Sequence, residues 1–260
     1  MSEAASLAAI ETGERAGPTL VFLHGFDGRK EIFRNLAEVF AGEGFHCLAF
    51  DLPGHGQSLE FPGFGPPKIA ARAVLAELER RDIREAHIVG HSMGGAVACL
   101  AALFAPERIR SLTLLAPGGF GPEIGLSPIR AVMEAEDEAA YRYGMAMMMA
   151  PGGELPADFL IERGGSEQRR AIRQIFDLLF GSGRQGILPL DAIAGVGCPI
   201  RVLWGEDDPV TPVEQCEGLP AAFHVTRLPE TGHMLMLEAF AACREIIEQA
   251  IRDAEGAQPG

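Results

Sequence analysis

The segment Gly90-His91-Ser92-Met93-Gly94 limits the possible fold more than any other part of this chain. An apolar run precedes it and a stretch with helical spacing follows, which predicts a strand, a tight turn and a helix. A serine on so tight a turn needs small neighbours because the flanking backbones come close together. The helix also directs N–H groups at the serine, which favours negative charge there. We therefore predict a nucleophilic serine at a strand end; the context on both sides disfavours the alternative, an incidental serine in a glycine-rich turn.

Short apolar runs alternate with stretches of helical spacing along most of the chain. This alternation is typical of an α/β fold with a parallel sheet and crossover helices. Several of the runs are apolar throughout, as expected for strands that helices cover on both faces. The predicted strands are residues 19–23, 45–50, 86–90, 111–115, 200–204 and 223–228.

The alternation stops between Pro117 and about Pro189. Two helical patterns lie in this stretch, at about 137–149 and 166–180. Because long structureless loops are uncommon in compact domains, we predict a small helical lid inserted into one sheet domain. The predicted boundaries are 1–117 for the first part of the core, 118–189 for the lid and 190–260 for the second part of the core.

The predicted nucleophile needs a base, and the base needs a third group to hold its tautomer. In this architecture the acid and then the histidine follow the serine along the chain. His224 falls inside a predicted strand, whereas His233 lies in the loop after it and is predicted to be the base. Asp207 and Asp208 both follow the strand at 200–204, and spacing alone does not separate them.

A tetrahedral oxyanion needs preorganised N–H donors, and two backbone amides are the usual solution. We predict the amide of Met93, next to the nucleophile, and the amide of Phe26, in the loop after the first predicted strand. His24 in the same loop is expected to hold it by hydrogen bonds, with a plain turn histidine as the alternative. Asp51 and His55 lie in a Pro/Gly turn and are expected to be structural.

Methionines gather beside the nucleophile, beside the base and in the predicted lid. Flexible thioethers suit an adaptable apolar pocket, although gap-filling packing is the alternative. The residues predicted to line a substrate pocket are Met145, Met148, Val210 and Met234.

The charge balance excludes several partners. Asp and Glu number 36 against 22 Lys and Arg, a formal net charge of −14, which repels nucleic acid and anionic lipid. The five scattered cysteines have no metal-ligand spacing, and no nucleotide motif is present, so no metal and no cofactor are expected. With neither a secretory leader nor an apolar run long enough to span a bilayer, we expect a cytoplasmic protein with a small-molecule acyl substrate. A homo-oligomer is compatible with the sequence.

Six segments resemble, in order, the markers of the α/β-hydrolase superfamily: LVFLHGFDG, AFDLPGHGQS, IVGHSMGG, APERIRSLTLLAP, VLWGEDDPV and TGHMLMLE. The resemblance implies the α/β-hydrolase fold, a mostly parallel central sheet flanked by helices with an inserted helical lid. It also selects Asp208 over Asp207, because in that family the acid typically follows the glycine by three residues. The implied triad is Ser92, Asp208 and His233.

Two further segments, SLTLLAPGGFGPEI and LLFGSGRQ, are similar to the hydrolase-like portion of the dihydrolipoamide acetyltransferase component of acetoin-cleaving complexes. This chain departs from that group because it has no lipoyl-lysine segment, so we expect a free-standing hydrolase. The expected reaction is cleavage of small to medium carboxylic esters or thioesters through an acyl-enzyme on Ser92. The alternatives are a C–C bond hydrolase or cofactor-free perhydrolase with the same triad, and a non-catalytic ligand-binding relative.

Overall fold

The computed structural model describes residues 6–59, 61–157, 159 and 164–256. Its centre is a seven-stranded sheet in the order β1-β3-β2-β4-β5-β6-β7, antiparallel between β1 and β3 and parallel elsewhere. The predicted fold class, a mostly parallel sheet flanked by helices, is confirmed. The strands are β1 (Ala9–Thr12), β2 (Thr19–Leu23), β3 (His46–Phe50), β4 (Ala86–His91), β5 (Ile109–Leu115), β6 (Ile200–Gly205) and β7 (Phe223–Leu228).

Every strand predicted from the sequence is present, with ends that differ by at most two residues. β2 and β3 are buried along their whole length, which explains why they are apolar on both faces. β1 was not predicted. It is a short antiparallel edge strand with an exposed Glu11, so it lacks the continuous apolar run of a central strand.

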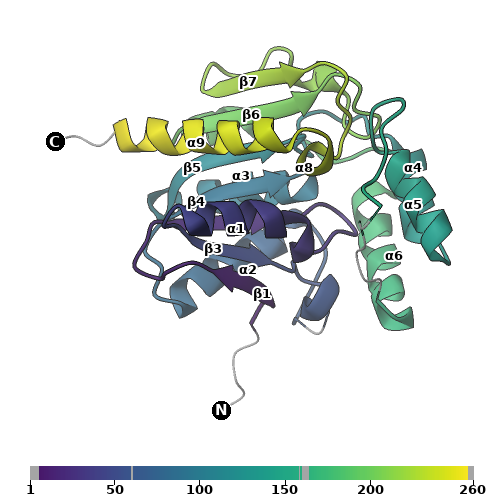
Figure 1. Ribbon diagram of the computed structural model, residues 1–260, viewed down its shortest axis with the longest axis horizontal. Coiled ribbons are helices and arrows are strands. Elements are labelled where there is room, and N and C mark those ends of the chain that lie inside the picture. The colour runs from purple at the N-terminus through teal and green to yellow at the C-terminus, as the bar shows by residue number, and fades with distance from the viewer. Residues whose placement is uncertain (1–5, 60, 158, 160–163, 257–260) are drawn as a thin grey trace.

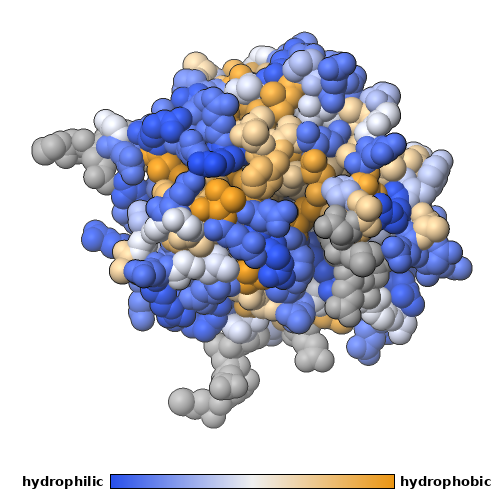
Figure 2. Space-filling model, viewed as in Figure 1, coloured by the Kyte–Doolittle hydropathy of each residue, from blue (hydrophilic) through white to orange (hydrophobic). Residues whose placement is uncertain are grey.

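Helices cover both faces of the sheet (Figure 1). α1 and α9 lie on one face, and α2 and α3 lie on the other. On the face turned to the viewer, hydrophilic residues cover most of the surface (Figure 2), as expected for amphipathic helices. The helices of the two layers are α1 (Arg34–Gly42), α2 (Pro67–Arg80), α3 (Met93–Phe104), α7 (Leu190–Ala194), α8 (Leu235–Glu238) and α9 (Phe240–Gly256), with short 3-10 helices η1 (Lys30–Phe33), η2 (Gly56–Ser58), η3 (Pro106–Arg108) and η4 (Val213–Cys216).

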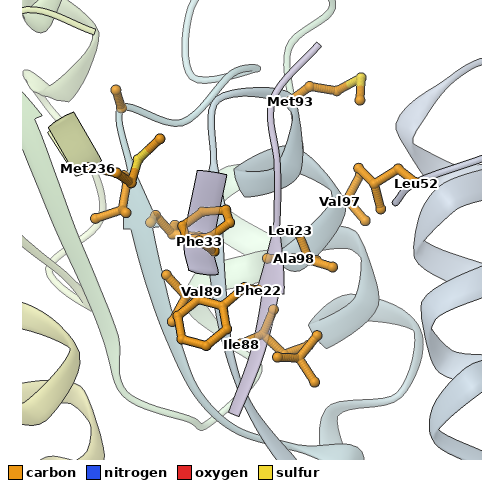
Figure 3. Close-up of a cluster of buried hydrophobic side chains, with 14 of the residues drawn as sticks. Phe22, Leu23, Phe33, Leu52, Ile88, Val89, Met93, Val97, Ala98 and Met236 are labelled. Carbon is orange, nitrogen blue, oxygen red and sulfur yellow. The ribbon is translucent and has the colours of Figure 1, made fainter. Parts of the chain in front are cut away.

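Buried side chains between the sheet and α3 hold the start of α3 in position (Figure 3). Leu23 of β2, Ile88 of β4 and Val97 of α3 are fully buried there. Full burial of one such side chain contributes roughly 1.5–3 kcal/mol. The N-terminal end of α3, which follows Ser92, is therefore held rigidly against the sheet.

The helices α4 (Leu126–Glu134), α5 (Glu138–Ala146) and α6 (Ser166–Phe180) lie beyond the carboxyl ends of the parallel strands (Figure 1). α5 and α6 correspond to the two helices predicted there, although α5 ends three residues before the predicted end. α4 was not predicted, because Pro128 stands near its start and its apolar stretch is short. The boundaries 118–189 for a lid stay a prediction.

The order in which strands join the sheet reverses at β2. The chain passes from β2 to β3 on one side of β2, then returns to add β4 on the other side. In open α/β sheets, ligands bind outside the carboxyl ends of the strands at such a switch point. The loops that leave β2 and β4 therefore flank a natural crevice.

No helix in the described ranges combines the length and the apolar character that crossing a membrane requires.

Candidate active site

Ser92 stands on a strained turn between β4 and α3, with a backbone φ of 53°. A Cβ on Gly90 would come within 2.3 Å of the Gly94 carbonyl oxygen, and a Cβ on Gly94 within 2.1 Å of the Leu23 carbonyl oxygen. Real side chains do not tolerate such approaches, so both glycines are required by sterics. The turn places Ser92 at the crevice beside β2.

The structure brings Asp208 and His233 together. Asp208 follows β6 and His233 follows β7, and the His233 Nδ1–H donates to Asp208 Oδ2 over 2.8 Å. Both side chains are buried, whereas the neighbouring Asp207 is exposed. With Nδ1 protonated, the lone pair of the neutral imidazole is on Nε2.

The Asp208 carboxylate is held in its ionised form. The amides of Val210 and Thr211 donate to its Oδ1 over 2.8 and 2.9 Å, and the Thr211 hydroxyl donates to Oδ2 over 2.9 Å. Burial opposes ionisation, but His233 and these hydrogen bonds outweigh it, so the pKa of Asp208 lies below its usual value. Asp208 is therefore a negative partner for the histidine at neutral pH.

Ser92 and His233 line the same cavity, which has a volume of about 490 Å³. Within the described chain no hydrogen bond joins the Ser92 hydroxyl to the His233 ring. Such bonds are often long without substrate and tighten in the complex. The residues that the sequence places in a substrate pocket, all of which line this cavity, are Met145, Met148, Val210 and Met234.

The loop after β2 is fixed by His24. The His24 Nδ1–H donates to the Gly25 carbonyl over 2.7 Å, and the Leu52 amide donates to His24 Nε2 over 3.0 Å. Burial lowers the pKa of His24, so the ring is neutral and accepts at Nε2. Phe26 and Met93 line the cavity, and among the described residues neither backbone amide donates to a protein acceptor. Both amides are available to a ligand.

The turn after β3 has a structural role. The Asp51 carboxylate pairs with the Lys30 ammonium over 2.5 Å and accepts the backbone amides of Lys30 and Gln57. Burial lowers the pKa of His55 to about 3, and the His24 ring adds to this effect. Asp51 and His55 are both described by the structure, and neither lines the cavity.

His91 is a site residue that sequence reasoning missed. Its Nε2–H donates to the main-chain carbonyl of His233 over 2.9 Å, and the two rings lie 4.7 Å apart. Burial, with His233 beside it, lowers the pKa of His91 to about 3, so the ring is neutral. The turn needs glycine at positions 90 and 94 but no particular residue at position 91, so the motif gives no signal for this contact. The two histidines are also distant in sequence.

Glu238 of α8 is a second residue that was missed. Its Oε1 accepts the Met234 amide over 2.9 Å, and its Oε2 accepts the amides of Gly232 and Ala150 over 2.9 and 2.8 Å. It therefore ties the loop of His233 to the segment after α5. The only sequence signal is its position five residues after His233.

The cysteines are not placed for metal binding or nucleophilic chemistry. All five are free thiols. Burial raises the pKa of Cys47 and of Cys243 to about 12, so both are protonated core side chains. In the part of the chain that the structure describes, no group of three or more His, Cys, Asp or Glu side chains is placed to hold a metal ion.

Comparison with known proteins gives matches over nearly the whole chain. The model of the Alpha/beta hydrolase family matches residues 20–246. The dihydrolipoyllysine-residue acetyltransferase component of the acetoin cleaving system from Pseudomonas putida is 33% identical over 234 residues, which are 88% of this chain and 62% of that protein. The chain thus spans less than two thirds of the length of that relative.

Other relatives match over most of their own length. The pimeloyl-(acyl-carrier protein) methyl ester esterase of Chromobacterium violaceum is 30% identical over 239 residues, 84% of this chain and 87% of that protein. The solved structure of a 2-hydroxy-6-oxo-6-phenylhexa-2,4-dienoate hydrolase from a Rhodococcus strain superposes with a TM-score of 0.78 at 22% identity, covering 95% of this chain and 94% of that one. The relatives include esterases, lipases and C–C bond hydrolases.

Proposed function

Since this chain belongs to the alpha/beta hydrolase family, we propose that it hydrolyses carboxylic esters or thioesters through an acyl-enzyme on Ser92. The observation that carries the proposal is the Asp208–His233 hydrogen bond of 2.8 Å at the cavity that Ser92 also lines. A buried carboxylate that fixes one histidine tautomer is what a serine nucleophile needs for activation.

In the first half-reaction, the Ser92 hydroxyl attacks the carbonyl carbon while His233 Nε2 takes its proton. The carbonyl oxygen becomes an oxyanion, which the amides of Phe26 and Met93 stabilise. Asp208 stabilises the imidazolium that forms. The oxyanion then collapses, the bond to the alcohol or thiol breaks, and His233 returns the proton to that leaving group.

In the second half-reaction, water attacks the Ser92 ester. His233 Nε2 takes a proton from the water, a second oxyanion forms at the same two amides, and the acid product leaves as the proton returns to the Ser92 oxygen. Atoms and charge balance without a cofactor. One histidine serves as base and then as acid in each half.

The character of the cavity supports a largely apolar acyl group of small to medium length. Its walls include the side chains of Met145, Met148 and Met234 near the catalytic end. A cavity of about 490 Å³ lies in the usual range of small-molecule sites. An esterase relative that matches over 87% of its own length supports ester chemistry.

A fluorophosphonate probe, which forms a covalent bond with activated serines, tests the nucleophile. We expect the wild-type protein to be labelled and Ser92→Ala to remain unlabelled. Wild-type protein should also turn over a panel of esters and thioesters from acetyl to octanoyl, and Ser92→Ala should lose this turnover. Correctly folded wild-type protein that is neither labelled nor active would instead indicate a ligand-binding relative.

The same site could cleave a C–C bond beside a ketone, and the reaction type needs its own test. Nitrophenyl esters and a dienoic ring-fission product are offered to the same preparation. Ester turnover with slow loss of the dienoate supports the proposal. Near-zero ester turnover with rapid loss of the dienoate would overturn it in favour of a C–C hydrolase.

A further inference from the structure

The cavity extends away from Ser92 along one face of α3. The α3 residues that line it are Met93, Ala96, Leu100 and Phe104. Spacings of three and four residues place them in one stripe along the helix. At about 1.5 Å per residue, this stripe is roughly 16 Å long. The site therefore suits an elongated chain with its carbonyl at one end.

The far end of the stripe opens to solvent through an apolar rim. Met93, at the Ser92 end of the stripe, is 7% exposed, whereas Phe104, at the other end, is 41% exposed. Leu178 and Ile187, each 62% exposed, also line the cavity. Large apolar side chains gathered at the surface beside a cavity mark a binding site. We call the part formed by Phe104, Leu178 and Ile187 the mouth.

Lys68 places a positive charge at the mouth. This second residue of α2 is exposed, lines the cavity and forms no ion pair with any described residue. Arg72 lies one turn further along α2, with its guanidinium 5.5 Å from the centre of the Phe104 ring. The other formally charged side chain among the described lining residues, Asp27, belongs to the loop after β2 at the catalytic end.

This cation stands out because the protein is acidic, with a net charge of −14. The chain has only two lysines, and the other, Lys30, is buried against Asp51. An unpaired ammonium at the end of an apolar channel complements a chain that ends in an anion. Ammonium–carboxylate hydrogen bonds are charge-assisted and stronger than neutral ones.

Building on the proposed function, we propose that the substrate is a half-ester or half-thioester of a medium-chain dicarboxylic acid. Its ester carbonyl lies at Ser92, its polymethylene chain lies along the α3 stripe, and its free carboxylate binds Lys68 at the mouth. The reaction is the one described above, and the product is the free diacid.

The test compares monomethyl with dimethyl esters of octanedioic, decanedioic and dodecanedioic acid, below their aggregation concentrations. We expect wild-type kcat/KM to be higher for the half-esters, and Lys68→Met to lower this preference by about fivefold. Raising the salt concentration should weaken the preference as well, because the ammonium is exposed. Arg84→Met, which removes a cation beyond the opposite end of α2, is the matched control and should keep the preference.

Binding to the Ser92→Ala variant separates this inference from the proposed function. Calorimetry should show that the half-ester binds more tightly than the dimethyl ester, and that adding Lys68→Met removes the difference. Equal binding of the two esters would overturn the inference, and cleavage of short neutral esters would still support the hydrolase. Turnover that begins only when the esters aggregate would also overturn it, and would indicate that the mouth binds a lipid surface.

Discussion

Each oxygen of the Asp208 carboxylate accepts two hydrogen bonds, so the side chain has one orientation. The Val210 and Thr211 amides donate to Oδ1, and the Thr211 hydroxyl and His233 Nδ1 donate to Oδ2. The carboxylate is buried, so these donors replace its water shell. The orientation of His233 thus depends on a small network around one acid.

Asp208→Asn keeps the shape of this network and changes its chemistry. The amide NH₂ cannot accept from His233 Nδ1–H, so the ring adopts the tautomer with its proton on Nε2. We expect kcat to fall by roughly 10⁴-fold with little change in KM.

Thr211→Val, which removes only the hydroxyl donor, should lower kcat by about tenfold, in line with the loss of one hydrogen bond to a charged group. Steady-state kinetics on one ester checks both, and an Asp208→Asn variant within tenfold of wild type would contradict the assigned role.

At the scale of elements, the loop of His233 and the segment after α5 are joined through their backbones. The His233 amide donates to the Met148 carbonyl over 2.8 Å. Glu238 then accepts amides from both segments, including those of Gly232 and Ala150. A shift of one segment would therefore displace the other, and with it His233.

Glu238→Ala tests this connection. Three amide donors lose their acceptor, and we expect a stability loss on the order of 2–4 kcal/mol together with a lower kcat, because the His233 loop is no longer fixed. Glu245→Ala is the matched control, since among the described residues Glu245 on α9 accepts only an exposed hydrogen bond from Gln249. Thermal melts and ester kinetics give the two readouts. A Glu238→Ala protein that melts and turns over like wild type would rule out the connection.

The elements that the sequence predicts are those with local signals. The central strands are short and mostly apolar, and Ser92 and His233 follow strand ends, so local patterns find them. Asp208 needed the family resemblance, because Asp207 has the same local context. His91 contacts His233, and Glu238 contacts Ala150, across long stretches of the chain, and no local pattern encodes such contacts.

At the scale of the whole molecule, several histidines are buried in neutral form. Burial lowers the pKa of His55 and His91 to about 3, and burial with nearby Arg110 lowers that of His87 to about 4. His24 shifts in the same direction. In the unfolded chain a histidine has a pKa of about 6.5. Between these values the unfolded state binds more protons than the folded state, so acid favours unfolding.

Stability should therefore fall as the pH is lowered from about 6.5 toward 4, and each such histidine should contribute up to about 1.4 kcal/mol per pH unit. Urea unfolding at pH 7, 6 and 5 measures this slope. His87, which is hydrogen-bonded to Ser111 and has no part in the proposed mechanism, is the histidine to replace: His87→Gln should reduce the slope by about the contribution of one histidine. The exposed His224→Gln is the matched control and should retain the wild-type slope. If His87→Gln retains it too, His87 does not contribute to acid unfolding in this pH range. Asp208 does not explain a slope there, because its pKa is lowered and its stabilising charge is lost only at still lower pH.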